Sequence, residues 1–437
     1  MVRKLVLLSL VCLCLASPAF ESSENLEDTD GPWSYLGVTG YSGMITMNAL
    51  TRSSLFYWLF ESIGGDITTD STPLIIWLQG GPGCSGGIGM FWANISPLSI
   101  YPNYANVFPT NLNYTWATDF HILSVDFPYG AGFSTAYSAG DEKNSTLSAT
   151  LYLYNFLIKL ARKYPTWFQR EIYVFGESYG GHWVPGLVFN ILQQNALNLT
   201  GITIPVVGMG LGDPWTDPMT QSQTYSLYSH TFSLINYNQM NVVNYYQSQV
   251  AQFLVQQNYL QAEYTWENSY STIVDFAGGI NYYNIRLFGE YNFDSLTNWL
   301  NKAGMKTIFH APSSATWNSC NDTVYNYYRS DIMNSTLPLV NYILSQGVKV
   351  IIYNGQDDLI VNAPGIENMI QSMNYTNFAK ATKQNWIVND TMAGYVQTAG
   401  NLTLALVLRS GHVVPHDQPL VAKDLVLRFI NNLPWND

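Results

Sequence analysis

The chain has 437 residues, a formal net charge of −12 and only 11% charged side chains, whereas aromatic residues make up 15%. This length and composition indicate a folded chain with a large core, either one α/β domain with an insertion or two domains. Lys and Arg form no cluster along the sequence, which argues against a nucleic-acid-binding protein, because such proteins carry a basic patch.

The N-terminal segment has the pattern of a secretory signal peptide. Arg3 and Lys4 precede an apolar run, and small residues after it allow cleavage behind Ala16 or Ala19. The run is too short to span a membrane, and no later run of that length is uninterrupted by polar residues. We therefore expect residues 1–19 to be removed and the mature chain to have no membrane anchor.

The remaining cysteines and the glycosylation sequons fit an oxidising compartment. Loss of the signal peptide leaves Cys84 and Cys320, which in an oxidising lumen most simply form one disulfide. Together with the signal peptide, the Asn-x-Ser/Thr sequons favour a glycoprotein. The nine sequons start at Asn94, Asn113, Asn144, Asn198, Asn321, Asn334, Asn374, Asn389 and Asn401.

Short apolar runs that end in Gly or Asp clusters recur along the chain and alternate with helical patterns. Each run is typical of a buried strand that ends at a loop. The six runs are PLIIWLQGG, FHILSVDFP, EIYVFGES, VVGMGLGD, VKVIIYNGQDD and LTLALVLRSGH. Apolar residues repeat at helical spacing from Leu147 to Ala161 and again in VAKDLVLRFINNL. The alternation predicts an α/β fold with a mostly parallel central sheet flanked by helices.

One segment interrupts this alternation. From about Asp217 to Trp317 the chain is rich in Tyr, Gln and Asn, and has long helical stretches but no convincing core strand. We predict that residues 217–317 form a helical cap inserted into a catalytic α/β domain, which would then consist of residues 20–216 and 318–437.

The stretch IYVFGESYGGHWVP carries the strongest catalytic signal. It contains a G-x-S-x-G motif with Ser178 at its centre, preceded by a predicted strand and followed by a predicted helix. The glycines permit a sharp turn that lifts the hydroxyl out of the sheet, and the next backbone N–H can face a developing oxyanion. The alternative is a turn in which Ser178 only caps the helix. The glycine-rich WLQGGPGCSGG loop could complete the oxyanion hole. It lacks the Lys and Ser/Thr that end a phosphate loop.

A serine nucleophile needs a general base, and His412 is the best candidate. It is the only histidine that follows a strong strand on a Gly turn, in LVLRSGHVVP. His182 lies within the predicted helix after Ser178 and is more typical of a structural residue. His412 and His416 do not form a zinc pair of the helical type, because Pro415 breaks the helix and no Glu follows His412. We expect neither a metal nor a cofactor.

The base needs an orienting carboxylate, which in this arrangement lies between the serine and the histidine in sequence. Asp213, Asp357 and Asp358 follow predicted strands. The pattern favours the NGQDD end, because it closes the last strand before the one that carries His412. The pattern does not choose between Asp357 and Asp358, and Asp213 could equally terminate its strand by capping.

These motifs together resemble the serine carboxypeptidases of the α/β-hydrolase superfamily. The resemblance covers nearly the whole mature chain. It runs through YSGMITMN, LFYWLFES, PLIIWLQGGPGCSGG, VDFPYGAGFS, IYVFGESYGGHWVP, YNGQDDLIVN and LRSGHVVPHDQP. Gln79 and NGQDD are similar to the vitellogenic-like and retinoid-inducible branches. Most of the family has Asn at the position of Gln79, and a family Glu is replaced near Ala93 or Asn94.

The resemblance assigns roles to residues by position. It implies Ser178 as nucleophile, His412 as base and Asp358 as acid. It also implies a disulfide between Cys84 and Cys320. The remaining implied positions are Gly81 and Tyr179 for the oxyanion hole, Gln79, Gly80 and Glu177 for the substrate carboxylate, and Ile360, Val361 and Val413 for the specificity pockets.

The resemblance also implies an activity. The expected enzyme releases C-terminal amino acids from peptides or proteins through an acyl-enzyme, at acidic pH and with apolar preference. It would work in a lysosome-like or vacuole-like compartment or outside the cell, as a monomer or homodimer. The alternatives are an acyltransferase or esterase on the same triad, and a non-catalytic glycoprotein that stabilises a partner.

Overall fold

A computed structural model describes residues 28–138, 140–141, 143–373, 375 and 378–435. The predicted signal peptide lies outside these residues. Within them, no helix has both the length and the apolar character needed to cross a membrane.

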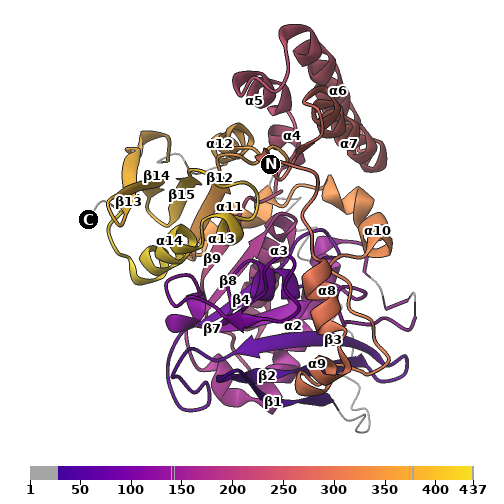
Figure 1. Cartoon of the computed structure of the whole chain (residues 1–437), viewed down its shortest axis with the longest axis vertical. Coiled ribbons are helices and arrows are strands. Elements are labelled where there is room, and N and C mark those ends of the chain that lie inside the picture. Colours follow the sequence, from indigo (N-terminus) through magenta and orange to yellow (C-terminus); the bar gives the residue numbers. More distant parts are fainter. Residues whose placement is uncertain (1–27, 139, 142, 374, 376–377, 436–437) are drawn as a thin grey trace.

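Six parallel strands form the centre of a large sheet, and they coincide with the six apolar runs (Figure 1). Each pairs in parallel with its neighbours among the six. In spatial order they are β7 (His121–Asp126), β4 (Leu74–Leu78), β8 (Ile172–Glu177), β9 (Val206–Gly212), β12 (Lys349–Gly355) and β15 (Leu402–Val407). Both faces of these strands are covered, which explains why they read as nearly continuous apolar runs.

Antiparallel strands extend the sheet at both edges to eleven strands. One edge carries β1 (Thr29–Tyr35), β2 (Val38–Asn48) and β3 (Ser53–Phe60), and the other carries β14 (Thr391–Ala399) and β13 (Gln384–Val388). None of the six predicted runs includes these strands. In β1, β13 and β14 buried and exposed residues are mixed. β3 is buried throughout, but it is followed by Glu61 and not by a Gly or Asp cluster.

Two hydrophobic cores lie on the two faces of the sheet, and alternate residues of β3 divide between them. Tyr57 packs in the core that also contains residues of α2 (Thr146–Lys163) and α3 (Gly180–Leu197). Trp58 packs in the core that contains residues of α14 (Pro419–Asn431). The other elements along this body are η1 (Ile88–Trp92), β5 (Leu98–Ser99), β6 (Phe108–Pro109), η2 (Trp116–Thr118), η3 (Pro165–Phe168), α11 (Leu337–Ser345), α12 (Ala363–Ser372), η4 (Phe378–Lys380) and α13 (Val414–Asp417).

The segment predicted as a cap contains helices in two places (Figure 1). The paired helices α6 (Tyr237–Val255) and α7 (Tyr259–Phe276) stand at one end of the molecule, together with α4 (Pro218–Gln221) and α5 (Tyr225–Thr231). The strands β10 (Ile280–Asn281) and β11 (Asn284–Phe288) follow. The next helices, α8 (Asp294–Leu300) and α9 (Ala303–Ile308), lie beside the body, and α9 contacts β1. The boundaries 20–216, 217–317 and 318–437 remain a prediction.

Candidate active site

Ser178 occupies a sharp turn between β8 and α3. Its φ of +63° is in the left-handed region, which a non-glycine residue adopts only where the surroundings enforce it. Ser178 N–H donates to the Gly212 carbonyl at 3.0 Å, and the Ser178 carbonyl accepts from Gly181 and Trp215 N–H, both at 2.9 Å. Glu177 and Tyr179 are buried, whereas Ser178 is partly exposed. The turn therefore presents this hydroxyl at the surface of the sheet edge.

The glycine-rich loop after β4 lies directly against this turn. A Cβ at Gly80 would be 2.6 Å from both the Glu177 carbonyl and the Ser178 Cβ, so only glycine allows this approach. Among the described residues, no protein acceptor is bonded to the N–H of Gly81 or of Tyr179. Two free backbone donors thus flank the serine, which is the requirement for an oxyanion hole.

The disulfide between Cys84 and Cys320 connects this loop to the start of α10 (Asp322–Ile332). Backbone hydrogen bonds flank it, from Ser85 N–H to the Ser319 carbonyl at 2.8 Å and from Asn321 N–H to the Gly83 carbonyl at 3.1 Å. The predicted disulfide is therefore present, and it ties the loop beside Ser178 to a helix far along the chain.

We expect the double variant Cys84→Ser/Cys320→Ser to lose about 2–4 kcal/mol of unfolding free energy, because a bond that closes a long chain loop restricts the unfolded state. Urea unfolding of the oxidised native protein and of the double variant measures this difference. Removing both thiols avoids mispairing. Equal unfolding free energies would contradict a stabilising role for the bond.

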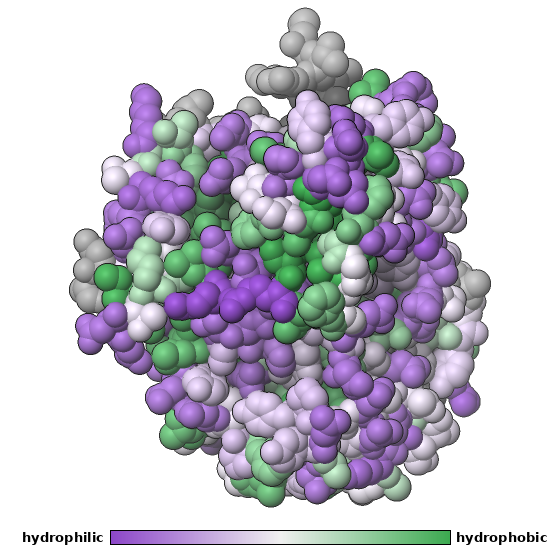
Figure 2. Space-filling view, turned by 45° about the horizontal axis from the view of Figure 1, so that its top comes forward, coloured by the Kyte–Doolittle hydropathy of each residue, from purple (hydrophilic) through white to green (hydrophobic). Residues whose placement is uncertain are grey.

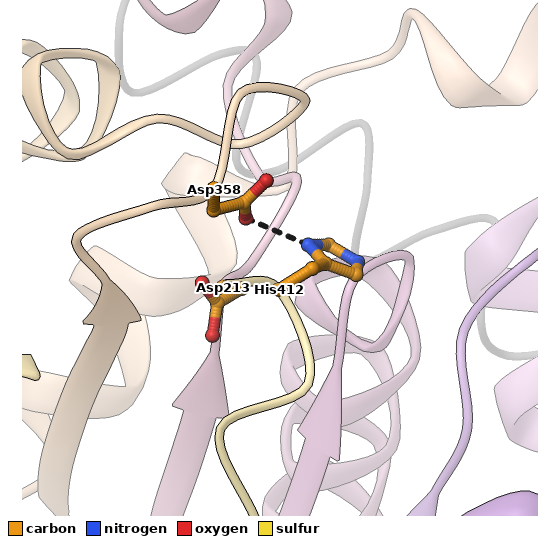
Figure 3. Close-up of side chains that lie close together, drawn as sticks. All are labelled: Asp213, Asp358 and His412. Carbon is orange, nitrogen blue, oxygen red and sulfur yellow. Dashed lines mark hydrogen bonds and ion pairs between the residues drawn. The ribbon is translucent and has the colours of Figure 1, made fainter. Parts of the chain in front are cut away.

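His412, after β15, and Asp358, after β12, form a buried pair (Figure 3). His412 Nδ1 lies 2.7 Å from Asp358 Oδ2, and Asp358 Oδ1 accepts from Val361 N–H at 3.1 Å. His412 Nε2 is buried and has no hydrogen-bond partner among the described residues. Asp357 points elsewhere, with its Oδ2 at 3.4 Å from Arg286 Nη1. The contact with His412 therefore distinguishes the two adjacent aspartates.

The charges around His412 favour its protonated form. Burial alone would lower the pKa of His412, but the Asp358 carboxylate, assisted by Glu177 and Asp417, outweighs burial and raises it above its usual value. A neutral Glu177 removes one of these contributions. The ionisation of Glu177 and the protonation of His412 therefore favour each other.

Asp213, the third candidate acid, lies close to the same pair (Figure 3). Oxygen atoms of Asp213 and Asp358 and a ring nitrogen of His412 all lie within 4.8 Å of one another. Asp213 Oδ1 accepts from Asn354 Nδ2 and from Gly355 N–H, each at 2.8 Å. The carboxyl ends of β9, β12 and β15 thus bring all three side chains to one point.

Glu177 is buried beside Ser178, and its carboxyl group is part of an oriented chain of hydrogen bonds. Trp77 Nε1–H donates to Gln79 Oε1 at 3.0 Å, which leaves Gln79 Nε2 to donate to Glu177 Oε1 at 3.1 Å. Glu177 Oε2 is buried, and no described residue bonds to it. Burial raises the pKa of the Glu177 carboxyl to about 7, although His412 and Gln79 act in the opposite direction.

A cavity of about 460 Å³ opens next to Ser178. Ile360 and Val361, both predicted for the specificity pockets, line it, whereas Val413 packs in the buried hydrophobic core. Further lining residues were not predicted, because they carry no motif. They come mainly from the loop after β9, from residues 266–283 and from α10. The aromatic ones among them are Trp215, Trp266, Tyr270, Tyr282, Tyr283 and Tyr325. Figure 2 shows hydrophobic side chains gathered in a recess of one face and bordered by hydrophilic ones.

Other predicted positions have structural contacts. Asn94, a sequon residue, is 5% exposed and its Oδ1 accepts from Ser99 Oγ at 2.9 Å, so the folded protein has no room for a glycan there. The ring nitrogens of His182 lie 2.7 and 2.8 Å from the carbonyls of Trp215 and Asn334. The ring of His416 stacks on Trp92 with centroids 3.6 Å apart.

Comparison with known proteins agrees with this geometry. The serine carboxypeptidase family profile matches residues 32–432. A probable serine carboxypeptidase, CPVL, of Dictyostelium discoideum is 32% identical over 95% of this chain and 82% of its own length. The venom serine carboxypeptidase of Apis mellifera is 30% identical over 90% of this chain and 85% of its own length.

A solved structure has the same fold. The crystal structure of Kex1(delta)p, a prohormone-processing carboxypeptidase from Saccharomyces cerevisiae, superimposes with a TM-score of 0.80 at 23% identity. The match covers 90% of this chain and 92% of the other. The match shows that the two chains share a fold. This agrees with the predicted α/β-hydrolase fold, a mostly parallel central sheet flanked by helices.

Proposed function

The chain belongs to the serine carboxypeptidase family, and on this premise we propose that Ser178, His412 and Asp358 form its catalytic triad. The observation that carries the proposal is the bond between His412 Nδ1 and Asp358 Oδ2 at 2.7 Å. The buried Nε2 has no hydrogen-bond partner in the part of the chain that the structure describes. Nε2 is the ring nitrogen that a serine base must use. The strained turn at Ser178 supplies the exposed hydroxyl.

The steps follow the chemistry of such a triad. Ser178 Oγ attacks the last peptide carbonyl while His412 Nε2 takes its proton, and Asp358 stabilises the imidazolium that forms. The N–H groups of Gly81 and Tyr179 bind the oxyanion. His412 then protonates the departing amino acid, and the acyl group stays on Ser178. A water molecule, deprotonated by His412, releases the shortened peptide.

Glu177, Gln79 and Gly80 form the proposed site for the C-terminal carboxylate of the substrate. A protonated Glu177 donates a hydrogen bond to that carboxylate, whereas an ionised Glu177 repels it. Burial places the pKa of Glu177 at about 7, so the binding form is populated below neutrality. The indole N–H of Trp77 binds the oxygen of the Gln79 amide, so the NH₂ group of Gln79 points toward Glu177 and acts there as a hydrogen-bond donor.

The substrates we propose are peptides and protein C-termini with apolar residues at the scissile bond. Ile360 and Val361 and the aromatic residues of the cavity next to Ser178 support this preference. The N-terminal pattern and the disulfide between Cys84 and Cys320 support passage through the secretory pathway, with a lysosome-like or extracellular destination.

A panel of N-blocked dipeptides, with each C-terminal amide as its partner, tests the function. Release of the C-terminal amino acid from the free acids, faster for Leu, Met or Phe than for Lys or Arg, supports the proposal. Equal hydrolysis of acids and amides at all pH values would instead indicate an esterase-like or amidase-like enzyme without carboxylate recognition. A Ser178→Ala protein, prepared in the same way, excludes contaminating proteases.

We expect the KM for a peptide acid to rise about tenfold per pH unit above pH 7, because only the fraction with protonated Glu177 binds. The KM for the matching amide should stay flat, since the amide has no carboxylate to repel. The measurement is KM against pH for both substrates. On the acid side, kcat/KM should fall as His412 becomes protonated.

Glu177→Gln is the matched variant for this test, because its amide can donate to a carboxylate at any pH. Its peptide KM should not rise with pH. The acid limb of its kcat/KM profile should move to lower pH, since the variant lacks a charge that favours protonated His412. A peptide KM that rises equally in the native enzyme and in Glu177→Gln would disprove the role of Glu177.

A further inference from the structure

Asp213 is a buried carboxyl group next to the triad that the steps above do not use. Its side chain is fully buried, its φ is +43°, and its backbone N–H donates to the Tyr353 carbonyl at 2.7 Å. Two N–H groups occupy Oδ1, whereas Oδ2 is buried and has no partner among the described residues. An unsatisfied oxygen in such a place requires an explanation.

The carboxyl group of Asp358 lies close to that of Asp213 and can act as the hydrogen-bond partner of this unsatisfied oxygen. Oxygens of the two carboxyl groups lie within 4.8 Å of each other and of His412, and Figure 3 shows the three side chains converging. Two carboxyl groups that share a buried site cannot both ionise without a large cost, so one of them keeps a proton. Asp358 Oδ1 accepts from Val361 N–H and its Oδ2 faces His412 Nδ1, whereas Asp213 Oδ2 has no partner among the described residues, so the geometry places the proton on Asp213.

The other groups around Asp213 also favour its neutral form. Burial, the charge of Asp358 and, more weakly, that of Glu177 raise the pKa of Asp213 well above its usual range. The phenols of Tyr228, Tyr291 and Tyr353 are further titratable neighbours of Asp213 in the described part of the chain, and they bring no positive charge. His412 is the nearby group that can become a cation, and Asp358 already holds its Nδ1.

We propose that Asp213 is a positioning residue whose protonated carboxyl donates Oδ2–H to the Asp358 carboxylate and holds it toward His412 Nδ1. This inference rests on the proposed triad. A neutral acid accepts two N–H groups at its carbonyl oxygen and donates from its hydroxyl, which accounts for every polar atom of Asp213. The triad thereby contains one negative charge next to His412, and the histidine can lose its proton and act as base.

Asp213→Asn is the isosteric test. The donors Asn354 and Gly355 keep its carbonyl at the Oδ1 position, so its NH₂ group takes the place of the hydroxyl and donates to Asp358. We expect kcat within about threefold of the native value and an unchanged acid-limb pKa in kcat/KM. A downward shift of that pKa would show that Asp213 had been a second negative charge, and would overturn the proposal.

Asp213→Gly removes the carboxyl group that donates to Asp358. Glycine is chosen because it adopts the positive φ of this position without strain, whereas alanine would be strained there. We expect kcat to fall by about 10–100-fold with KM nearly unchanged, the loss typical of one hydrogen bond to a charged group. The acid limb should move to higher pH, because an unsupported Asp358 favours protonated His412. If Asp213→Asn is as impaired as Asp213→Gly, the hydrogen bond to Asp358 is not what Asp213 provides.

Infrared spectroscopy detects the proton without any activity measurement. At pH 8, in a Glu177→Gln background that removes the buried Glu177 carboxyl with its raised pKa, the C=O stretch of a neutral carboxylic acid should be present. It should disappear in Glu177→Gln/Asp213→Asn. Absence of this band in the background protein would overturn the inference even if Ser178→Ala abolishes turnover. Turnover in Ser178→Ala would remove the proposed triad but leave the band as evidence about Asp213.

Discussion

Replacing Ser178 with alanine should lower kcat by about 10⁶-fold, the loss typical of a triad that has no nucleophile. The free backbone donors of Gly81 and Tyr179 remain in this variant, so a small rate above that of the uncatalysed reaction should persist. Alanine cannot form the acyl-enzyme, and the φ of +63° at this position already strains any non-glycine residue. The fold should therefore be retained.

The measurement is the release of a C-terminal amino acid at saturating substrate, with labelling by a serine-directed phosphonate as a second readout. Ser314→Ala, which changes an exposed serine, serves as the matched control and should retain native activity and labelling. Turnover near the native rate in Ser178→Ala, or labelling that persists at another residue, would refute the assignment of the nucleophile.

Asp358→Asn should lower kcat by about 10⁴-fold, as loss of the carboxylate does in enzymes with this triad. An asparagine can present its NH₂ group to His412 Nδ1, which then becomes an acceptor and places the ring proton on Nε2. In that tautomer Nε2 cannot take the proton of Ser178. Substrate binding does not involve Asp358, so KM should change little.

Asp357→Asn is the control that the chain itself provides. Asp357 is adjacent in sequence and follows the same strand, but its carboxylate pairs with Arg286, whose side chain is largely exposed. Such a pair contributes little to stability, and kcat should remain within about threefold of the native value. A larger loss of kcat in Asp357→Asn than in Asp358→Asn would reverse the assignment of the acid.

The amino-acid sequence by itself determined the centre of the fold and suggested two members of the proposed triad. The six central strands are buried on both faces, so each is a continuous apolar run that can be recognised without any knowledge of its neighbours. Ser178 and His412 could be proposed from local patterns: a glycine-flanked turn after a strand in one case, and a Gly turn at the end of a strand in the other. Such signals depend on nearby residues only.

Only the tertiary structure decided what depends on distant residues. Asp357 and Asp358 are equivalent in the local pattern, and only the family resemblance pointed to Asp358. In the structure the contact with His412 separates them, because the loop after β12 directs their side chains differently. The sequence does not say which end of the Gln79 amide faces Glu177. In the structure the indole N–H of Trp77 binds the amide oxygen and so fixes the orientation.

The cavity beside Ser178 and the edge strands were also inaccessible from local patterns. Residues of α7 and α10, far apart in sequence, line the cavity together, and no spacing rule relates them. The mixed exposure of β1, β13 and β14 arises because β1 and β13 are the edge strands of the sheet and β14 lies next to β13, positions that follow from strand pairing. The proposed partnership of Asp213 and Asp358 is of the same kind, because it exists only where the ends of β9 and β12 meet.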